Sequence, residues 1–172
     1  EPVADFFDIM VIGDGETASL EICRAVRKAK KDVGVQKSDI LDIISHIPGI
    51  YIPSFFQTRY EPDGRIAAIV PEHDDYKWVT KATLPHLDSC PYPERQIVPF
   101  TELVHDRVTI EISRGCTRGC RFCQAGMIYR PVRERSPESI VNIAEKTLNL
   151  TGYEDLSLLS LSSGDYSHIG SL

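Results

Sequence analysis

Three cysteines stand close together in the second half of the chain, at Cys116, Cys120 and Cys123. Their spacing is C-x3-C-x2-C, so three thiols that can ligate a metal fall within one short segment. Gly115 before the array and Gly119 inside it let the backbone wrap closely around a bulky group. Three thiolates are one ligand short of the set that holds an ordinary iron–sulfur cluster. One iron would then stay open to bind a cofactor and take part in chemistry.

The spacing of these cysteines is also compatible with three simpler roles. A structural zinc site usually joins two C-x2-C pairs, or one pair and histidines, and the histidine nearest in sequence is His105. A thioredoxin-like redox pair of Cys120 and Cys123 would leave Cys116 without a role. The three could also be buried unliganded thiols, although their polar neighbours are unusual in a core.

The array lies between the elements of a predicted βαβ unit. Residues 108–112 alternate apolar and polar side chains, as in a strand with one buried face. Ser136 and Pro137 are typical N-cap and first-position residues of a helix, which Gly152 should end. Residues 156–161 predict the next strand. Two such strands should pair in parallel through a right-handed crossover.

The N-terminal region predicts an α/β arrangement. A buried strand near residues 8–12 runs into a glycine turn. A helix is predicted over 16–32, with an apolar stripe from Ile22 to Val33 and basic residues toward its C-terminal half. A second helix, over 37–47, should stop at Pro48-Gly49. We expect residues 1–48 to be part of an α/β domain.

A hairpin and a proline-rich linker are predicted between these regions, over residues 49–106. One arm should run from Tyr51 to Tyr60 and the other from Ile66 to Val70, with turn residues between them. The prolines and charges of 71–106 predict a linker that packs on its surroundings. The third region is then 107–172, and the predicted fold class is α/β.

Composition limits the class of protein. The chain has 172 residues, 42% hydrophobic and 26% charged, which is typical of a globular protein. Its formal net charge of −6 argues against a general nucleic-acid binder. We expect no membrane span, because no apolar run approaches about 18 residues, and we predict a cytoplasmic location. Because the sequence starts at Glu1 and ends abruptly, we expect a piece of a longer protein.

Positive charge gathers around the cysteines. Residues 107–135 hold seven arginines but only two glutamates. These arginines could tune a cluster, hold a cofactor carboxylate or bind an anionic substrate. They could equally pair with acids elsewhere in the fold or face water. RNA is one candidate partner, but we find no aromatic stacking platform.

The array resembles that of the radical S-adenosylmethionine (SAM) superfamily, with Phe122 before the last cysteine and the loop placed after the first strand of a βαβ unit. The resemblance covers residues from about 107 to the end and implies the first βαβ unit of a (β/α)6 partial barrel. The longer stretch Glu111–Pro137 resembles a subgroup with an N-terminal cobalamin-binding-like domain, and Gly13–Glu16 is similar to a turn near the end of that domain. The resemblance implies that residues 1–48 are the C-terminal part of such a domain, which is Rossmann-like.

The resemblance implies residue roles and cofactors. Cys116, Cys120 and Cys123 would bind three irons of a [4Fe–4S] cluster, and SAM would chelate the fourth. One electron from the cluster would split a carbon–sulfur bond of SAM, giving methionine and a 5′-deoxyadenosyl radical that takes a hydrogen atom from a substrate. Phe122 would lie beside the adenine. Ser163, Gly164 and Asp165 stand where the family has a Gly-Gly-Glu motif for the cofactor's ammonium group, although a simple turn at the strand end also accounts for them.

From this resemblance we predict part of a radical SAM enzyme acting on an unknown substrate that is anionic or RNA-linked. It would draw electrons from a low-potential donor that is flavodoxin- or ferredoxin-like. Cobalamin would bind only in the full-length protein, because the family's cobalt-ligating histidine motif has no match here. The excised piece itself should be inactive. The alternative is a non-catalytic zinc-binding or interaction module that uses the same cysteines.

Overall fold

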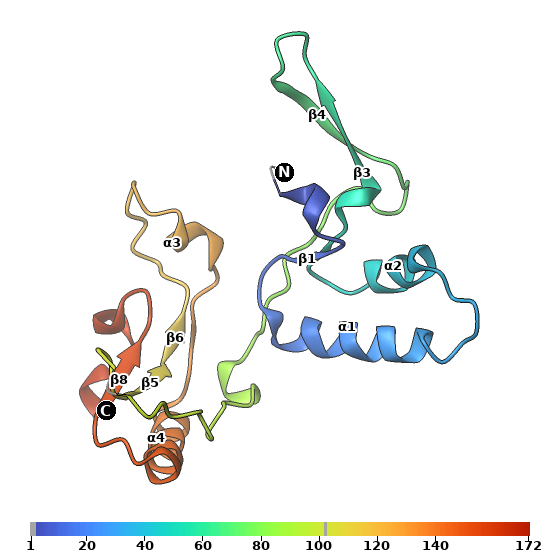
Figure 1. The fold of residues 1–172 in the computed structure, drawn as a ribbon. Helices are drawn as coiled ribbons and strands as arrows, with labels where there is room; N and C mark the ends of the chain where they lie inside the picture. The colour runs from blue at the N-terminus through green and yellow to red at the C-terminus, as the bar shows by residue number, and fades with distance from the viewer. Residues whose placement is uncertain (1–2, 102) are drawn as a thin grey trace. The chain divides into compact units, whose positions relative to one another are not determined.

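The structure is a computed structural model that describes residues 3–101 and 103–172. The chain forms two compact units, Glu1–Leu84 and Pro85–Leu172 (Figure 1). Both units mix helices with two-stranded sheets, so the predicted α/β class is confirmed at this level. The predicted domain limits at residues 48 and 106, the Rossmann-like end and the partial barrel remain predictions.

The first unit packs two helices against short strands. Strands β1 (Met10–Val11) and β2 (Ile50–Tyr51) pair antiparallel, and helices α1 (Gly15–Ala29) and α2 (Lys37–Ser45) contact each other. Apolar side chains from these elements and from the 3-10 turn that follows β2 close the core. Its buried members are Ile44, Ile50, Ile52 and Phe55.

Both helices end earlier than the sequence predicts. Helix α1 stops at Ala29, and the chain then turns to Gly34, whose φ is +90°. Val33, predicted to extend the apolar stripe, is therefore fully exposed. Helix α2 stops at Ser45, because the residue before a proline disfavours helical geometry and Ile47 precedes Pro48.

The predicted hairpin is confirmed, with one correction to its first arm. Strand β3 (Phe56–Tyr60) pairs antiparallel with β4 (Ile66–Pro71). The turn is closed by two backbone bonds, from Glu61 N–H to Arg65 O at 2.8 Å and from Gly64 N–H to Glu61 O at 2.9 Å. Tyr51, which the sequence places in the first arm, pairs with β1 instead.

The second unit contains the predicted βαβ motif. Strands β5 (Val108–Glu111) and β8 (Leu156–Leu159) pair in parallel, and helix α4 (Pro137–Thr151) connects them. The alternating side chains of the first strand place its apolar members in the core under this helix. The buried members of the core are Val108, Ile110, Ile112, Ile140, Ile143 and Tyr166.

The predicted ends of α4 are also confirmed. The Ser136 hydroxyl accepts a hydrogen bond from Ser139 N–H at 3.2 Å. Gly152 takes the left-handed conformation, with φ +76°, and donates its N–H to Leu148 O at 2.9 Å. Ser-Pro at one end and glycine at the other fix both ends of this helix.

The remaining regular elements are short. Strands β6 (Ser113–Arg114) and β7 (Arg133–Glu134) pair antiparallel, and α3 (Ala125–Ile128) is a single turn between them. The 3-10 helices are η1 (Ala4–Phe6), η2 (Pro53–Phe55), η3 (Leu87–Ser89), η4 (Ser163–Asp165) and η5 (Ile169–Ser171). Within the described residues, no helix combines the length and the apolar character needed to cross a bilayer.

Candidate metal and cofactor site

The cysteines lie on a loop that is closed at its base. The β6–β7 ribbon brings Ser113 opposite Glu134 and Arg114 opposite Arg133, so residues 115–132 project from the end of β5 as one excursion (Figure 1). Two-residue strands carry no recognisable periodicity, and the sequence did not predict this ribbon. Its consequence is that the whole cysteine array is carried by a single anchored loop.

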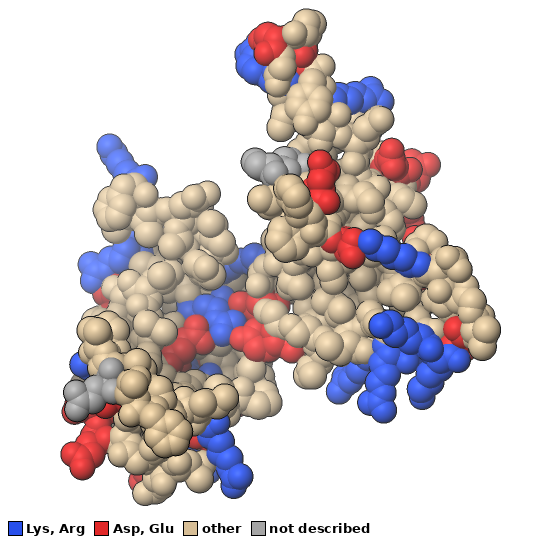
Figure 2. Space-filling view, in the orientation of Figure 1, with Lys and Arg blue, Asp and Glu red and all other residues tan. Residues whose placement is uncertain are grey.

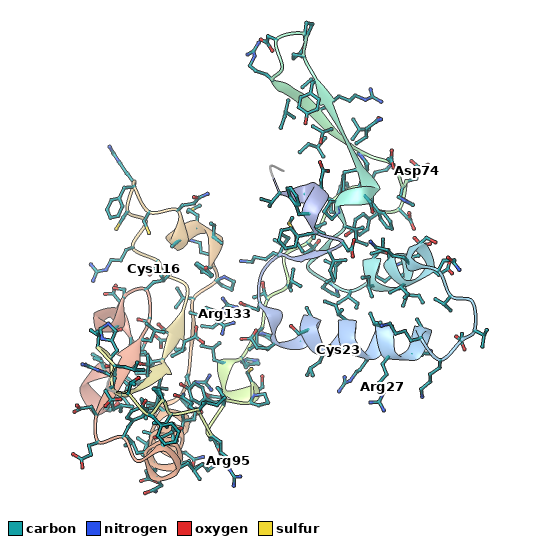
Figure 3. All side chains as sticks on the ribbon, viewed as in Figure 1. Cys23, Arg27, Asp74, Arg95, Cys116 and Arg133 are labelled. Atoms are coloured by element: carbon teal, nitrogen blue, oxygen red, sulfur yellow. The ribbon has the colours of Figure 1, made fainter. Side chains whose placement is uncertain are left out.

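Gly115 and Arg133 tighten the base of the loop. Gly115 has φ +90°, and a Cβ atom there would lie 2.6 Å from Tyr129 O and 2.7 Å from Pro131 O. Arg133 is only 8% exposed and donates to the same two carbonyls, to Pro131 O from Nε at 3.0 Å and to Tyr129 O from Nη2 at 3.2 Å. Figure 3 labels Arg133 near this base and Cys116 on the loop. Only glycine combines this backbone conformation with so close an approach.

The three cysteines share the irregular part of that loop. None is in a disulfide, and Cys120 is exposed while Cys116 and Cys123 are half-buried. Cys123 N–H donates to Cys120 O at 3.0 Å, and Arg118 N–H points to Cys116 Sγ at 3.4 Å. The loop therefore offers three thiols and a backbone N–H donor to sulfur, which is the chemistry that holds iron–sulfur clusters.

The three cysteine thiols do not converge on one point in the structure. Over residues 3–101 and 103–172, no three histidine, cysteine or acidic side chains meet in an arrangement that could hold a metal ion. The thiols are not fixed apart by separate rigid elements, however, because the segment from Cys116 to Cys123 has no helix or strand bonding. The donor set fits a cluster, and the assignment of the three cysteines as ligands remains a prediction.

The aspartate that follows β8 contacts the cysteine loop. The Asp165 carboxylate accepts hydrogen bonds from Arg118 through Nε at 2.6 Å and through a second guanidinium nitrogen, and from Ser162 Oγ at 2.7 Å. These bonds lower the pKa of Asp165 from 3.8 to about 2, the Arg118 bond being the largest cause. The same pairing raises the pKa of Arg118. The ion pair thus joins the loop to the carboxyl end of the second parallel strand.

Two hollows lie around these strand ends. One, of about 30 Å³, is lined partly by Gly115, Cys116 and Asp165. The other, of about 310 Å³, is lined mainly by apolar surface and includes Tyr129 and Leu159. Ligands of α/β proteins commonly bind beyond the carboxyl ends of parallel strands, so the cysteines and Asp165 occupy a suitable position.

The other residues predicted to bind the cofactor are less constrained. Phe122 is 92% exposed. Ser163 Oγ lies 3.0 Å from Ser160 Oγ, and a Cβ atom on Gly164 would meet open space. The structure therefore brings Asp165 beside the cysteine loop but leaves Phe122 in solvent. The cofactor roles of all four residues remain predictions.

Most of the arginines around the loop have internal partners. Arg114 Nε and Nη2 lie 3.0 and 2.8 Å from the Glu111 carboxylate oxygens. Arg135, 4% exposed, donates to Leu87 O at 2.9 Å and to Glu111 O at 3.2 Å. Together with Arg118 and Arg133, these contacts support the structural alternative for the arginine cluster. The sequence could not choose for Arg118 and Arg135, because their partners Asp165 and Leu87 lie 47 and 48 residues away in the chain.

Comparison with protein families gives two matches. The model described as "Radical SAM proteins, N-terminal" covers residues 1–53, and the model described as "Radical SAM superfamily" covers residues 110–171. The chain belongs to the radical SAM superfamily. The second match includes the cysteine loop and the βαβ motif of this radical SAM chain. The cobalamin-binding-like character of its N-terminal region remains a prediction, since the match names that region only as the N-terminal part of radical SAM proteins.

Two curated proteins are similar to the radical SAM chain. One is "Uncharacterized protein MJ0966" of Methanocaldococcus jannaschii, 26% identical over 98% of the chain and 30% of that protein. The other is "Threonylcarbamoyladenosine tRNA methylthiotransferase MtaB" of Bacillus subtilis, 26% identical over 72% of the chain and 26% of that protein. The chain thus spans less than a third of either relative. No solved structure matches.

Proposed function

We propose that this chain carries the cluster-binding part of a radical SAM enzyme, with Cys116, Cys120 and Cys123 as ligands of a [4Fe–4S] cluster. The observation that supports this most is the single anchored loop with three thiols, inside the segment that matches the superfamily. A cluster held by these cysteines would supply the low-potential electron for reductive cleavage of SAM. Superfamily membership does not favour a zinc module built on the same cysteines.

The chain's own residues would bind and orient SAM. Asp165 provides a carboxylate that stays charged to low pH, which suits an ammonium group. Arg118 provides a guanidinium beside it, which suits a carboxylate. Ser163 and Gly164 offer backbone groups at the same strand end, and the exposed Phe122 ring can stack on adenine.

We further propose that the substrate is RNA and that a flavodoxin- or ferredoxin-like donor reduces the cluster in the cytoplasm. The support for RNA is the similarity to the Bacillus subtilis protein, a threonylcarbamoyladenosine tRNA methylthiotransferase. Because the chain spans less than a third of either relative, we expect these 172 residues alone to cleave no SAM.

The proposal can be tested on the full-length protein, reconstituted with iron and sulfide without oxygen. On reduction with dithionite in the presence of SAM, we expect release of 5′-deoxyadenosine. Cys116→Ala, Cys120→Ala and Cys123→Ala should each abolish it. Cys23→Ala is the matched control, because Cys23 is an exposed thiol on α1 outside the array. Equal activity in the array variants and the control would contradict the proposal.

A further inference from the structure

A row of cations lies along one face of α1 and of the turn that follows it. Arg24, Arg27, Lys28 and Lys31 follow the i, i+3, i+4, i+7 spacing that places side chains on one side of a helix. All four are exposed. We call these four residues the α1 basic face. Figure 2 shows lysine and arginine side chains gathered over α1, and Figure 3 labels Arg27 there.

The opposite side of the same helix is its packing side. Ala18 and Ala29 are buried, and Ile22 and Ala25 pack against the core of the first unit. The basic face therefore points away from the unit to which the helix belongs. Its side chains can change without disturbing that core.

Within the described part of the chain, the four cations lack acidic partners, as do Lys30 and Arg59 of the same unit, whereas three other cations of the unit have such partners. Lys37 pairs with Asp8, Arg65 with Asp63 at 2.7 Å, and Lys77 approaches Asp74 at 4.0 Å; these pairs are the comparison set. Among the residues that the structure describes, no ion pair reaches Arg24, Arg27, Lys28 or Lys31. Glu21 and Asp32 lie near them in sequence, but neither forms such a pair.

Local helix stability does not account for this arrangement. Cations near a helix C-terminus complement its dipole, but the effect falls off within the last turn. Arg24 lies outside that turn, and like charges at i, i+3 and i+4 repel each other. A row of unpaired cations in a chain with a net charge of −6 is instead complementary to an external polyanion.

We propose that the α1 basic face binds the phosphate backbone of the RNA substrate. From Arg24 to Lys28 the face extends about 6 Å along α1, at roughly 1.5 Å per residue, and Lys31 continues it into the following turn, which is enough to meet successive phosphates. Helix α1 has no aromatic residue that could stack on a base. The face therefore positions RNA without reading its sequence. This inference takes from the proposed function only the RNA class of the substrate.

The experiment is RNA binding by the full-length protein, measured by fluorescence anisotropy with a labelled single-stranded RNA of mixed sequence. The test variant carries Arg24→Gln, Arg27→Gln, Lys28→Gln and Lys31→Gln. The matched control carries Lys37→Gln, Arg59→Gln, Arg65→Gln and Lys77→Gln, which removes the same charge from exposed positions of the same unit. Circular dichroism checks that both variants fold.

We expect the test variant to bind at least about tenfold more weakly, while the control changes less than about twofold. The slope of log affinity against log salt should shrink by about 3 in the test variant, because each contact of a single strand contributes about 0.7. An equal loss in both variants would overturn the inference. So would binding of the wild-type protein to anionic phospholipid vesicles but not to RNA. Release of 5′-deoxyadenosine, measured separately, should be the same in all three proteins. Failure of the proposed radical chemistry can therefore be told apart from failure of the RNA-binding inference.

Discussion

The arginines around the cysteine loop and the cations on α1 differ in burial and in partners. Around the cysteine loop, Arg133 and Arg135 are buried and donate to backbone carbonyls, and Arg118 is paired with Asp165. On α1, Arg24 and Lys28 are exposed and have no acidic partner among the described residues. The sequence does not predict which of these cations are buried or paired, since both regions are rich in positive charge.

The comparison distinguishes cations that hold the fold in place from cations that remain able to bind an anionic ligand. A buried guanidinium that satisfies several carbonyls holds the chain in place, and removing it leaves those acceptors without partners. An exposed, unpaired cation contributes little to the fold and remains able to bind an anion. The cations nearest the candidate cluster mainly shape its loop, and those available for a large anionic substrate lie on α1.

The sharpest contrast should be in stability. Arg135→Ala removes the donors to Leu87 O and Glu111 O from a side chain that is 4% exposed. We expect it to lower the free energy of unfolding by about 3 kcal/mol, since unsatisfied buried groups cost about 1–3 kcal/mol each. Arg27→Ala, the exposed control, should change it by less than about 0.5 kcal/mol. Urea denaturation measures both, and similar effects of the two changes would break the comparison.

The base of the cysteine loop offers a second test. Gly115 has φ +90°, and the Cβ atom of an alanine there would lie 2.6 and 2.7 Å from two carbonyl oxygens. In Gly115→Ala the β6–β7 ribbon must therefore open or shift. We expect a loss of at least about 2 kcal/mol in unfolding free energy. Gly152→Ala is the matched control in the same unit, with φ +76° but no atom within 4 Å of the added Cβ.

Because only backbone strain acts at Gly152, its replacement should cost about 1 kcal/mol. Urea denaturation again gives both values. If the two glycines were equally sensitive, the close approach at the loop base would not be what anchors the loop.

The smallest effect concerns the exposed Arg118–Asp165 pair. Because the folded pKa of Asp165 is lowered to about 2 from its ordinary 3.8, the pair is fully formed above pH 3.8 and is lost as the pH falls through about 2. Arg118→Gln should raise the pKa of Asp165, while Arg24→Gln should leave it unchanged. NMR titration of the carboxyl carbon measures this, and an unchanged pKa in Arg118→Gln would show that the pair does not form.

Strong local signals made much of the second unit predictable. Ser136-Pro137 and Gly152 mark the ends of α4, and the alternation over 108–112 marks β5, so the parallel βαβ motif followed from sequence. The β6–β7 ribbon did not, because two-residue strands have no period. Three cysteines in one array were equally visible in the sequence.

The partners of Arg118 and Arg135 were not predictable from the local sequence. Arg118 and Asp165 are 47 residues apart, and Arg135 lies 48 residues from Leu87. Such contacts depend on how the strands and the proline-rich segment pack, which local patterns do not encode. For the same reason, the sequence does not show that the cations of the α1 basic face lack acidic partners. Its pattern indicates only that they complement the helix dipole.

The most direct test of the central claim is the metal content of the full-length protein after anaerobic purification and reconstitution. With three thiolate ligands on the 115–132 loop, we predict about four irons and four sulfides per chain, and their loss when Cys116, Cys120 and Cys123 are all replaced by alanine. One zinc per chain, or iron that survives the triple replacement, would contradict the account.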